Sequence, residues 1–171
     1  MKNHRLAISS LLFAALFATS HGAALAQTAA AQAAPPPPST YGAPIGFDAA
    51  RSAGAAAVAE AERNGWKMSI AIVDPAGQLV HFQKMDNSGG ATGPIAIEKA
   101  KSSALFRRPT KFFQDGIAAG NMFWLGMPGA VPVGGGFPLV ADGKVVGGIG
   151  VSGGTGAQDE AVARAAADQL K

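Results

Sequence analysis

A glycine-rich segment near the C-terminus contains two motifs known from cofactor and catalytic sites. Residues 148–153 read G-x-G-x-x-G, the dinucleotide-binding fingerprint, which holds a pyrophosphate at a helix N-terminus. Residues 150–154 read G-x-S-x-G, the elbow that presents a nucleophilic serine in α/β-hydrolases. The two motifs share residues and require different chemistry, so at most one of them can be functional.

Neither motif has the context that its chemistry needs. A dinucleotide site requires a βαβ unit, but these glycines fall in the second strand of an expected hairpin, and no strand follows the last helix. In α/β-hydrolases the acid and the histidine follow the serine, but no histidine follows Ser152, and nothing specific supports a pair with His81. The sequence therefore argues against both sites.

The alternation of residues 145–152 gives a third interpretation. In a strand, Gly148, Gly150 and Ser152 point to one face, which is left nearly without side chains. Glycines in such a run indicate that backbone or a ligand approaches closely. Either an alanine-rich helix packs on this face or a flat ligand binds there, so these three residues are candidate ligand-binding residues. The amides of residues 153–157 either cap the next helix or bind an anion.

The composition limits metal chemistry. The chain has no cysteine, and of its three histidines only His81 lies beyond residue 26. Zinc sites with several Cys or His ligands, iron–sulfur clusters and disulfides are therefore excluded, and no metal site is expected. No basic patch with interleaved aromatic residues occurs, so nucleic acid is not an expected partner.

The first 42 residues have two parts. Residues 1–26 have the form of a secretory signal peptide, with a basic start, an apolar stretch over residues 6–17 and an A-x-A cleavage site ending at Ala26. We therefore expect cleavage after Ala26 and a periplasmic or secreted protein that has no membrane anchor. Residues 27–42, rich in alanine and proline, predict a disordered spacer. Residues 43–171 suit one domain.

Hairpins and helices alternate in the pattern of this domain. Asp74–Gly77 fits a type I turn and Asp142-Gly143 fits a type I′ turn, each between two strands. Antiparallel hairpins with separate helices indicate an α+β fold and not a doubly wound one. The expected elements are helices at 47–64, 92–106, 110–116 and from 156, strands at 66–73, 78–85, 137–141 and 144–152, and a possible short strand at 122–125.

Three stretches resemble the GlcG/HbpS-like family: SIAIVDPAGQLVHFQKMDNS, IEKAKSSALFRRPTKF and GGFPLVADGKVVGGIGVSGGTGAQDE. The resemblance spans roughly residues 47–171. It implies a profilin-like fold, with an antiparallel sheet of about five strands flanked by helices, and a homo-oligomer. Family members include haem-binding and haem-degrading proteins, the C-terminal domain of PduO-type proteins is related, and other members accompany glycolate metabolism.

The resemblance implies haem as cofactor and indicates further ligand-binding residues. Thr110 matches a segment implicated in the haem pocket of similar proteins, and its neighbours Arg107, Arg108 and Lys111 are able to pair with propionates or a small carboxylate. The alternatives are an N-cap for Thr110 and a solvated basic edge for the three cations. His81 is a candidate axial ligand, because imidazole is a usual haem donor, or else a packed or surface residue.

Two functions are consistent with these features. The first is an exported haem- or tetrapyrrole-binding protein, with the haem-degrading or redox-linked chemistry that is attributed to similar proteins. The second is a non-catalytic accessory protein that binds a small organic acid of the glycolate type. No residue is identified as catalytic, and whether the protein is an enzyme stays open.

Overall fold

A computed structural model of the chain describes residues 40–170. The predicted signal peptide and the predicted spacer up to residue 39 lie outside the described residues. Within residues 40–170, no helix is long and apolar enough to cross a membrane.

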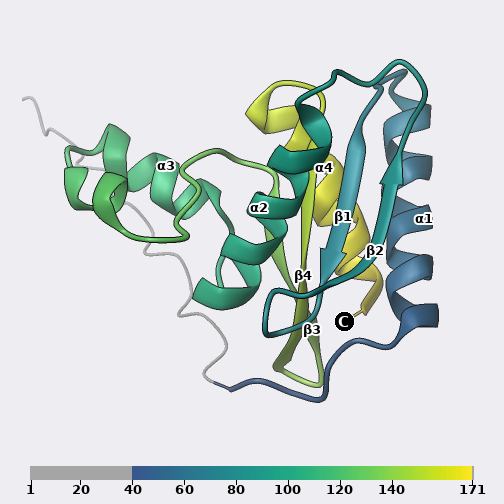
Figure 1. The fold of residues 1–171 in the computed structure, drawn as a ribbon, viewed down its shortest axis with the longest axis horizontal. Helices are drawn as coiled ribbons and strands as arrows, with labels where there is room; N and C mark the ends of the chain where they lie inside the picture. Colours follow the sequence, from purple (N-terminus) through teal and green to yellow (C-terminus); the bar gives the residue numbers. More distant parts are fainter. Residues whose placement is uncertain (1–39, 171) are drawn as a thin grey trace, which may run out of the picture. The chain divides into compact units, whose positions relative to one another are not determined.

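Helices and strands follow one another in almost the predicted order (Figure 1). The described chain has four strands, one fewer than the resemblance implied, and the fold is α+β as expected. Residues 122–125 do not form a strand; they lie in a 3-10 helix and pair with no strand of the described sheet. The elements are α1 (Phe47–Arg63), β1 (Ser69–Val73), β2 (Leu79–Lys84), α2 (Thr92–Phe106), α3 (Lys111–Ala118), η1 (Met122–Gly126), β3 (Gly136–Ala141), β4 (Lys144–Ser152), α4 (Gly156–Ala167) and η2 (Asp168–Leu170).

The sheet is built from two hairpins whose inner strands pair. The strand order is β2-β1-β4-β3, and every pairing is antiparallel. The β3–β4 turn has Asp142 and Gly143 at φ of 50° and 70°, as a type I′ turn requires. In the β1–β2 turn, the Asp74 carboxylate accepts hydrogen bonds from the amides of Ala76 and Gln78 at 2.9 and 2.8 Å. Local turn chemistry therefore sets both hairpins.

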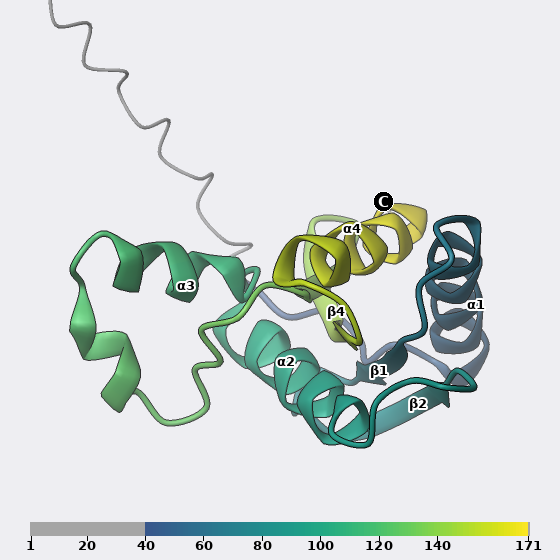
Figure 2. The same ribbon diagram turned by 90° about the horizontal axis from the view of Figure 1, so that it is seen from above.

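Helices cover both faces of this sheet (Figure 2). On one face, α1 and α4 pack their alanines on a core that includes Ile70, Ile72, Ile149 and Val151. On the other face, α2 packs on β1 and β4, and its apolar cluster is smaller; the cluster comprises Ala71, Val73, Ala96, Ala100 and Ala104.

The segment before α1 belongs to the folded domain. The amides of Gly42 and Ile45 donate to the carbonyls of Val145 and Val146 at 2.9 and 2.8 Å. The Tyr41 hydroxyl lies 3.0 Å from the carbonyl oxygen of Leu105, at the end of α2. The predicted disordered spacer therefore does not include residues 40–42, because backbone pairing with β4 orders them.

Candidate functional site

The nearly bare face of β4 is filled by the backbone of α2. A Cβ built on Gly148 would lie 2.5 Å from the Ala100 carbonyl oxygen, and one built on Gly150 would lie 2.0 Å from that of Ala96. Real side chains do not come this close to backbone, so the glycines permit the helix to lie directly on the strand. The alanine-rich helix was the correct alternative. Gly148 and Gly150 are not ligand-binding residues, because α2 occupies the space that a ligand would need.

Ser152 and His81 lie on opposite faces of the sheet. Ser152 is buried and pairs in register with Ser69, whose hydroxyl is 2.7 Å from that of Thr92 on α2. His81 pairs with Ile72, which belongs to the core beneath α1. The sheet therefore separates serine and histidine, which excludes the hydrolase pair. It also places Ser152 under α2 and not at an open ligand site.

Two of the amides that follow Ser152 are used by the chain itself. Gly154 donates to Asp159 Oδ1 at 2.9 Å and Thr155 donates to Gln158 Oε1 at 2.8 Å. The Thr155 hydroxyl in turn accepts from the Gln158 amide at 3.3 Å, which completes a capping box. Capping, and not anion binding, is therefore the observed role of the Gly154 and Thr155 amides.

A buried ion pair lies close to these amides, and the sequence did not reveal it. Lys99 Nζ donates to Asp159 Oδ2 at 2.7 Å and to the Val151 carbonyl at 3.0 Å. The two side chains are 1% and 4% exposed. The one indication of the pair in the sequence was a lysine on the face of α2 that is buried. Its partner, Asp159, lies far away along the chain. The pair ties α2 to the end of β4 and to the first turn of α4.

Thr110 is buried, and its hydroxyl already makes two hydrogen bonds within the protein. Its Oγ1 donates to the Val133 carbonyl at 2.6 Å and accepts from the Gly136 amide at 2.9 Å. Thr110 does occupy the N-cap position of α3, as the alternative expected, but its side chain makes no capping hydrogen bond to the helix. Thr110 holds the loop before β3 in place, and it is not available as a haem ligand because no part of it is exposed.

The three cations beside Thr110 do not converge on one point. The Arg107 guanidinium lies over the Tyr41 ring, 5.4 Å from its centroid, and that of Arg108 lies 4.2 Å from the centroid of Phe112. Lys111 pairs with Asp115 within its own helix at 2.5 Å, and this hydrogen bond raises the pKa of the lysine. The basic residues thus have separate local partners and do not form an anion site together.

His81 packs beneath α1. Its Nε2 lies 2.9 Å from the position that a Cβ on Gly54 would take, and the ring of Phe47 meets it edge-on at 6.3 Å. The Nε2 atom is buried and has no hydrogen-bond partner among the described residues. His81 is therefore a half-buried, packed residue, and its Nε2 is not open to an iron.

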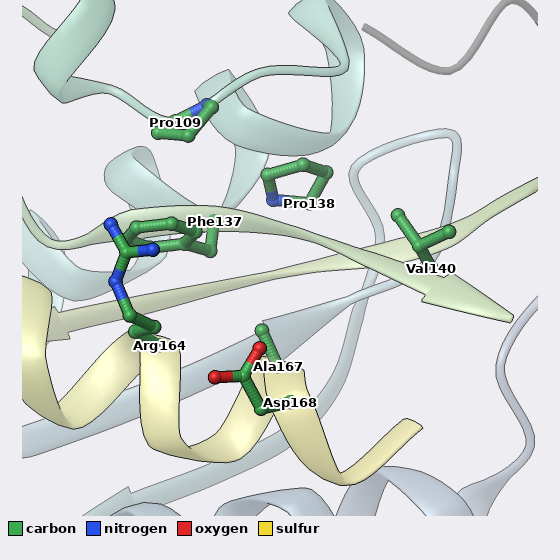
Figure 3. Close-up of a pocket in the computed structure, with 7 residues that line it drawn as sticks. All are labelled: Pro109, Phe137, Pro138, Val140, Arg164, Ala167 and Asp168. Atoms are coloured by element: carbon green, nitrogen blue, oxygen red, sulfur yellow. The ribbon is translucent and has the colours of Figure 1, made fainter. Parts of the chain in front are cut away.

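One hollow lies beside the predicted basic segment, between the edge strand β3 and α4 (Figure 3). Its volume is about 160 Å³, and we call it the β3–α4 hollow. Arg164 reaches from α4 to the ring of Phe137, 4.8 Å from its centroid, and also pairs with Glu160 at 3.0 Å. The lining residues are Pro109, Phe137, Pro138, Val140, Arg164, Ala167 and Asp168.

The lining of the β3–α4 hollow fits part of a haem. Phe137, Pro138 and Val140 offer apolar contact for a flat macrocycle, and Arg164 offers a guanidinium for a propionate. The volume is below the roughly 300–1,000 Å³ of sites that enclose a ligand, so the hollow can take only one side of it. The lining holds no His, Met, Tyr or Cys side chain for iron. No group of three or more metal-ligating side chains gathers within residues 40–170.

Comparisons with known proteins agree on one family. A family model described as "Haem degrading protein HbpS-like" matches residues 45–168. Protein GlcG of Escherichia coli K12 is 42% identical over 98 residues, which cover 57% of this chain and 73% of that protein. An uncharacterized 15.0 kDa protein of Citrobacter freundii is 32% identical over 130 residues, covering 74% of this chain and 92% of that protein.

Solved structures of similar proteins share the fold. A double mutant of HbpS from Streptomyces reticuli has a TM-score of 0.70 at 33% identity, covering 77% of this chain and 90% of that chain. A structure described as a PduOC:heme complex has a TM-score of 0.67 at 25% identity, covering 75% of this chain and 96% of that chain. The family model matches most of the chain, and the solved structures share its fold over about three quarters of its length. This chain therefore belongs to the HbpS-like family.

Proposed function

We propose that the protein binds haem in the β3–α4 hollow. The observation that supports this site is an apolar surface on an edge strand with an arginine held over its aromatic ring, Arg164 on Phe137. Membership of a family described as haem degrading, and the haem complex of a similar structure, support the choice of ligand.

The lining residues would hold the ligand by two kinds of contact. The macrocycle would lie against Phe137 and Pro138, because burial of flat apolar surface gives most of the binding free energy. A propionate would pair with Arg164, whose stacking on Phe137 restricts its rotamers before the ligand arrives. Bound haem would supply any redox or degradative chemistry, and this chain's residues would bind and orient it.

A second copy of the chain would complete the site. The β3–α4 hollow takes one side of a macrocycle, and β3 is an edge strand whose outer side another chain can approach. We therefore propose a homo-oligomer that covers the haem, to be tested by light scattering of the protein with and without haemin. A mass that stays that of one chain in both states would contradict it.

We also propose that the protein is exported. The support is the N-terminal pattern of residues 1–26, with its cleavage site at Ala26. N-terminal sequencing of protein from the periplasm or culture medium should give Gln27 as the first residue. Protein that stays in the cytoplasm with Met1 intact would contradict export.

The organic-acid function has less support. It relied on convergence of Arg107, Arg108 and Lys111 and on the amides that follow Ser152. The cations are held apart by separate partners, and the amides of Gly154 and Thr155 are already bonded. Haem binding is therefore the function that we propose.

Titration with haemin tests this function. Purified protein should shift and sharpen the Soret band of haemin until one saturating ratio is reached. Arg164→Ala should weaken binding about tenfold, because a charge-assisted hydrogen bond is lost. Arg51→Ala is the matched control, since Arg51 also pairs with an acid one turn away on an exposed helix face. No saturable change, or equal weakening by both variants, would contradict the proposal.

A further inference from the structure

A second hollow lies at the opposite edge of the sheet, where the last turns of α1 meet the end of β2. Its volume is about 330 Å³, and it is open to solvent. We call it the α1–β2 hollow. Its lining residues are Val58, Glu62, Lys67, Gln83, Lys84, Met85 and Asp86. None of them lines the β3–α4 hollow, so this surface is independent of the haem proposal.

Charged side chains of both signs border the α1–β2 hollow, and they form no ion pairs with one another. Six ion pairs join described residues to one another, and all six lie elsewhere. Within residues 40–170, the side chains of Glu62, Lys67, Lys84 and Asp86 make no hydrogen bond or ion pair with another described residue. Two ammonium groups and two carboxylates therefore border one concave surface and are available to a ligand.

A buried acceptor points to the same ligand chemistry. Gln83 lines the α1–β2 hollow, and its Oε1 is buried without a partner, 3.1 Å from the Cβ position of Gly54. His81 Nε2, which also lacks a partner, lies 2.9 Å from that position. Buried acceptors without donors are rare because they lose their bonds to water. Rotation of the Gln83 amide would free this oxygen from its buried position, and a ligand with N–H groups would then supply the donor that it lacks.

We propose that the α1–β2 hollow binds a small zwitterion that carries an ammonium and a carboxylate, of the kind found in free α-amino acids and short peptides. The ammonium would be held by Glu62 and Asp86, with the amide oxygen of Gln83 joining them once it has rotated, and the carboxylate by Lys67 and Lys84. Val58 and Met85 would contact an apolar side chain of the ligand.

Calorimetric titration of the purified protein with matched probes tests this ligand chemistry. L-leucine has both charges, N-acetyl-L-leucine lacks the ammonium, and L-leucinamide lacks the carboxylate. We expect saturable heat from L-leucine at millimolar concentration and at least tenfold weaker binding of both analogues. A leucine dipeptide is the fourth probe and shows whether the site prefers a free amino acid or a peptide. No saturable heat from leucine or the dipeptide, or equal binding of an analogue with one charge, would overturn the proposal.

Variants locate the site. Lys67→Gln and Glu62→Gln should each weaken binding of the preferred probe about tenfold, because each removes one charge-assisted contact. Lys101→Gln is the control, since Lys101 is an exposed lysine of α2 that pairs with Glu98. All of these positions are on the surface, so thermal unfolding should confirm an unchanged fold. Unchanged affinity in both hollow variants, or equal loss in the control, would overturn the assignment.

Discussion

The two faces of β4 are packed in different ways, although the same nine residues form both. Toward α1 and α4, Ile149 and Val151 fill the core with side chains. Toward α2, Gly148 and Gly150 present backbone that the helix backbone touches directly. The first face is held by apolar volume, whereas the second is held by close backbone contact and by a buried ion pair at its end.

The difference shows how missing side chains should be interpreted. A strand face without side chains leaves space beside the strand, and the nearest group fills that space. In this protein the nearest group is α2. The candidate ligand surfaces are instead at the two edge strands, β2 and β3, beside which no further strand pairs within residues 40–170. Glycine in a strand therefore indicates close packing, and it does not by itself indicate a ligand.

The largest expected effect comes from one added methyl group on the α2 face. Gly150→Ala places a Cβ 2.0 Å from a backbone oxygen that cannot move without shifting α2. We expect the free energy of unfolding to fall by more than about 4 kcal/mol, or folding to fail. Gly90→Ala is the control, because nothing lies within 4 Å of its Cβ position. Equal stability of the two variants in denaturant unfolding would show that α2 does not lie on the strand as described.

The buried ion pair should give the next largest effect. Lys99→Met leaves the Asp159 carboxylate buried without its cation, which should lower the free energy of unfolding by about 3–5 kcal/mol. The double variant Lys99→Met with Asp159→Leu should recover much of this loss, because it also removes the uncompensated charge. Additive losses measured by denaturant unfolding would mean that the two side chains do not act as a pair.

A single methyl group removed from the opposite face should cost much less. Ile149→Val deletes one methyl from the α1–α4 core and should lower the free energy of unfolding by about 0.5–1.5 kcal/mol. Because residue 149 is next to Gly150, the two variants compare the faces at one place in the strand. If Ile149→Val lowers the free energy of unfolding as much as Gly150→Ala in the same experiment, the two faces of β4 are not packed differently.

The smallest effect is expected at the end of α2. Tyr41→Phe keeps the ring under Arg107 but removes the hydroxyl that donates to the Leu105 carbonyl. We expect a loss of about 0.5–1 kcal/mol of unfolding free energy, since the bond is partly exposed. An unchanged midpoint of thermal unfolding would mean that residues before α1 do not help to hold α2.

Elements with local signals were predicted well. The strand at 144–152 and the turn at Asp142-Gly143 agree with the structure, and the first helix ends one residue before its predicted end. For the amides that follow Ser152, the capping alternative is also confirmed, by the capping box at Thr155. These features depend on alternation, turn residues and capping residues that are neighbours in the sequence, so a local pattern is enough to predict them.

Features that depend on distant partners were not predicted. No local pattern indicates that Lys99 pairs with Asp159, because the contact exists only once α2 and α4 meet across the end of β4. Thr110 was expected to bind a ligand, but the loop before β3 takes both hydrogen bonds of its hydroxyl. Tyr41 was assigned to a spacer because its neighbours are of low complexity, whereas backbone pairing with β4 decides its position.

The most direct test of the account is haemin titration of a variant in which the edge-strand hollow is filled. Val140→Phe adds a ring to the β3–α4 hollow, and Val133→Phe makes the same change at an exposed position outside it. We predict at least tenfold weaker haemin binding for Val140→Phe and wild-type affinity for Val133→Phe. Wild-type affinity in Val140→Phe would contradict the placement of haem at β3 and α4.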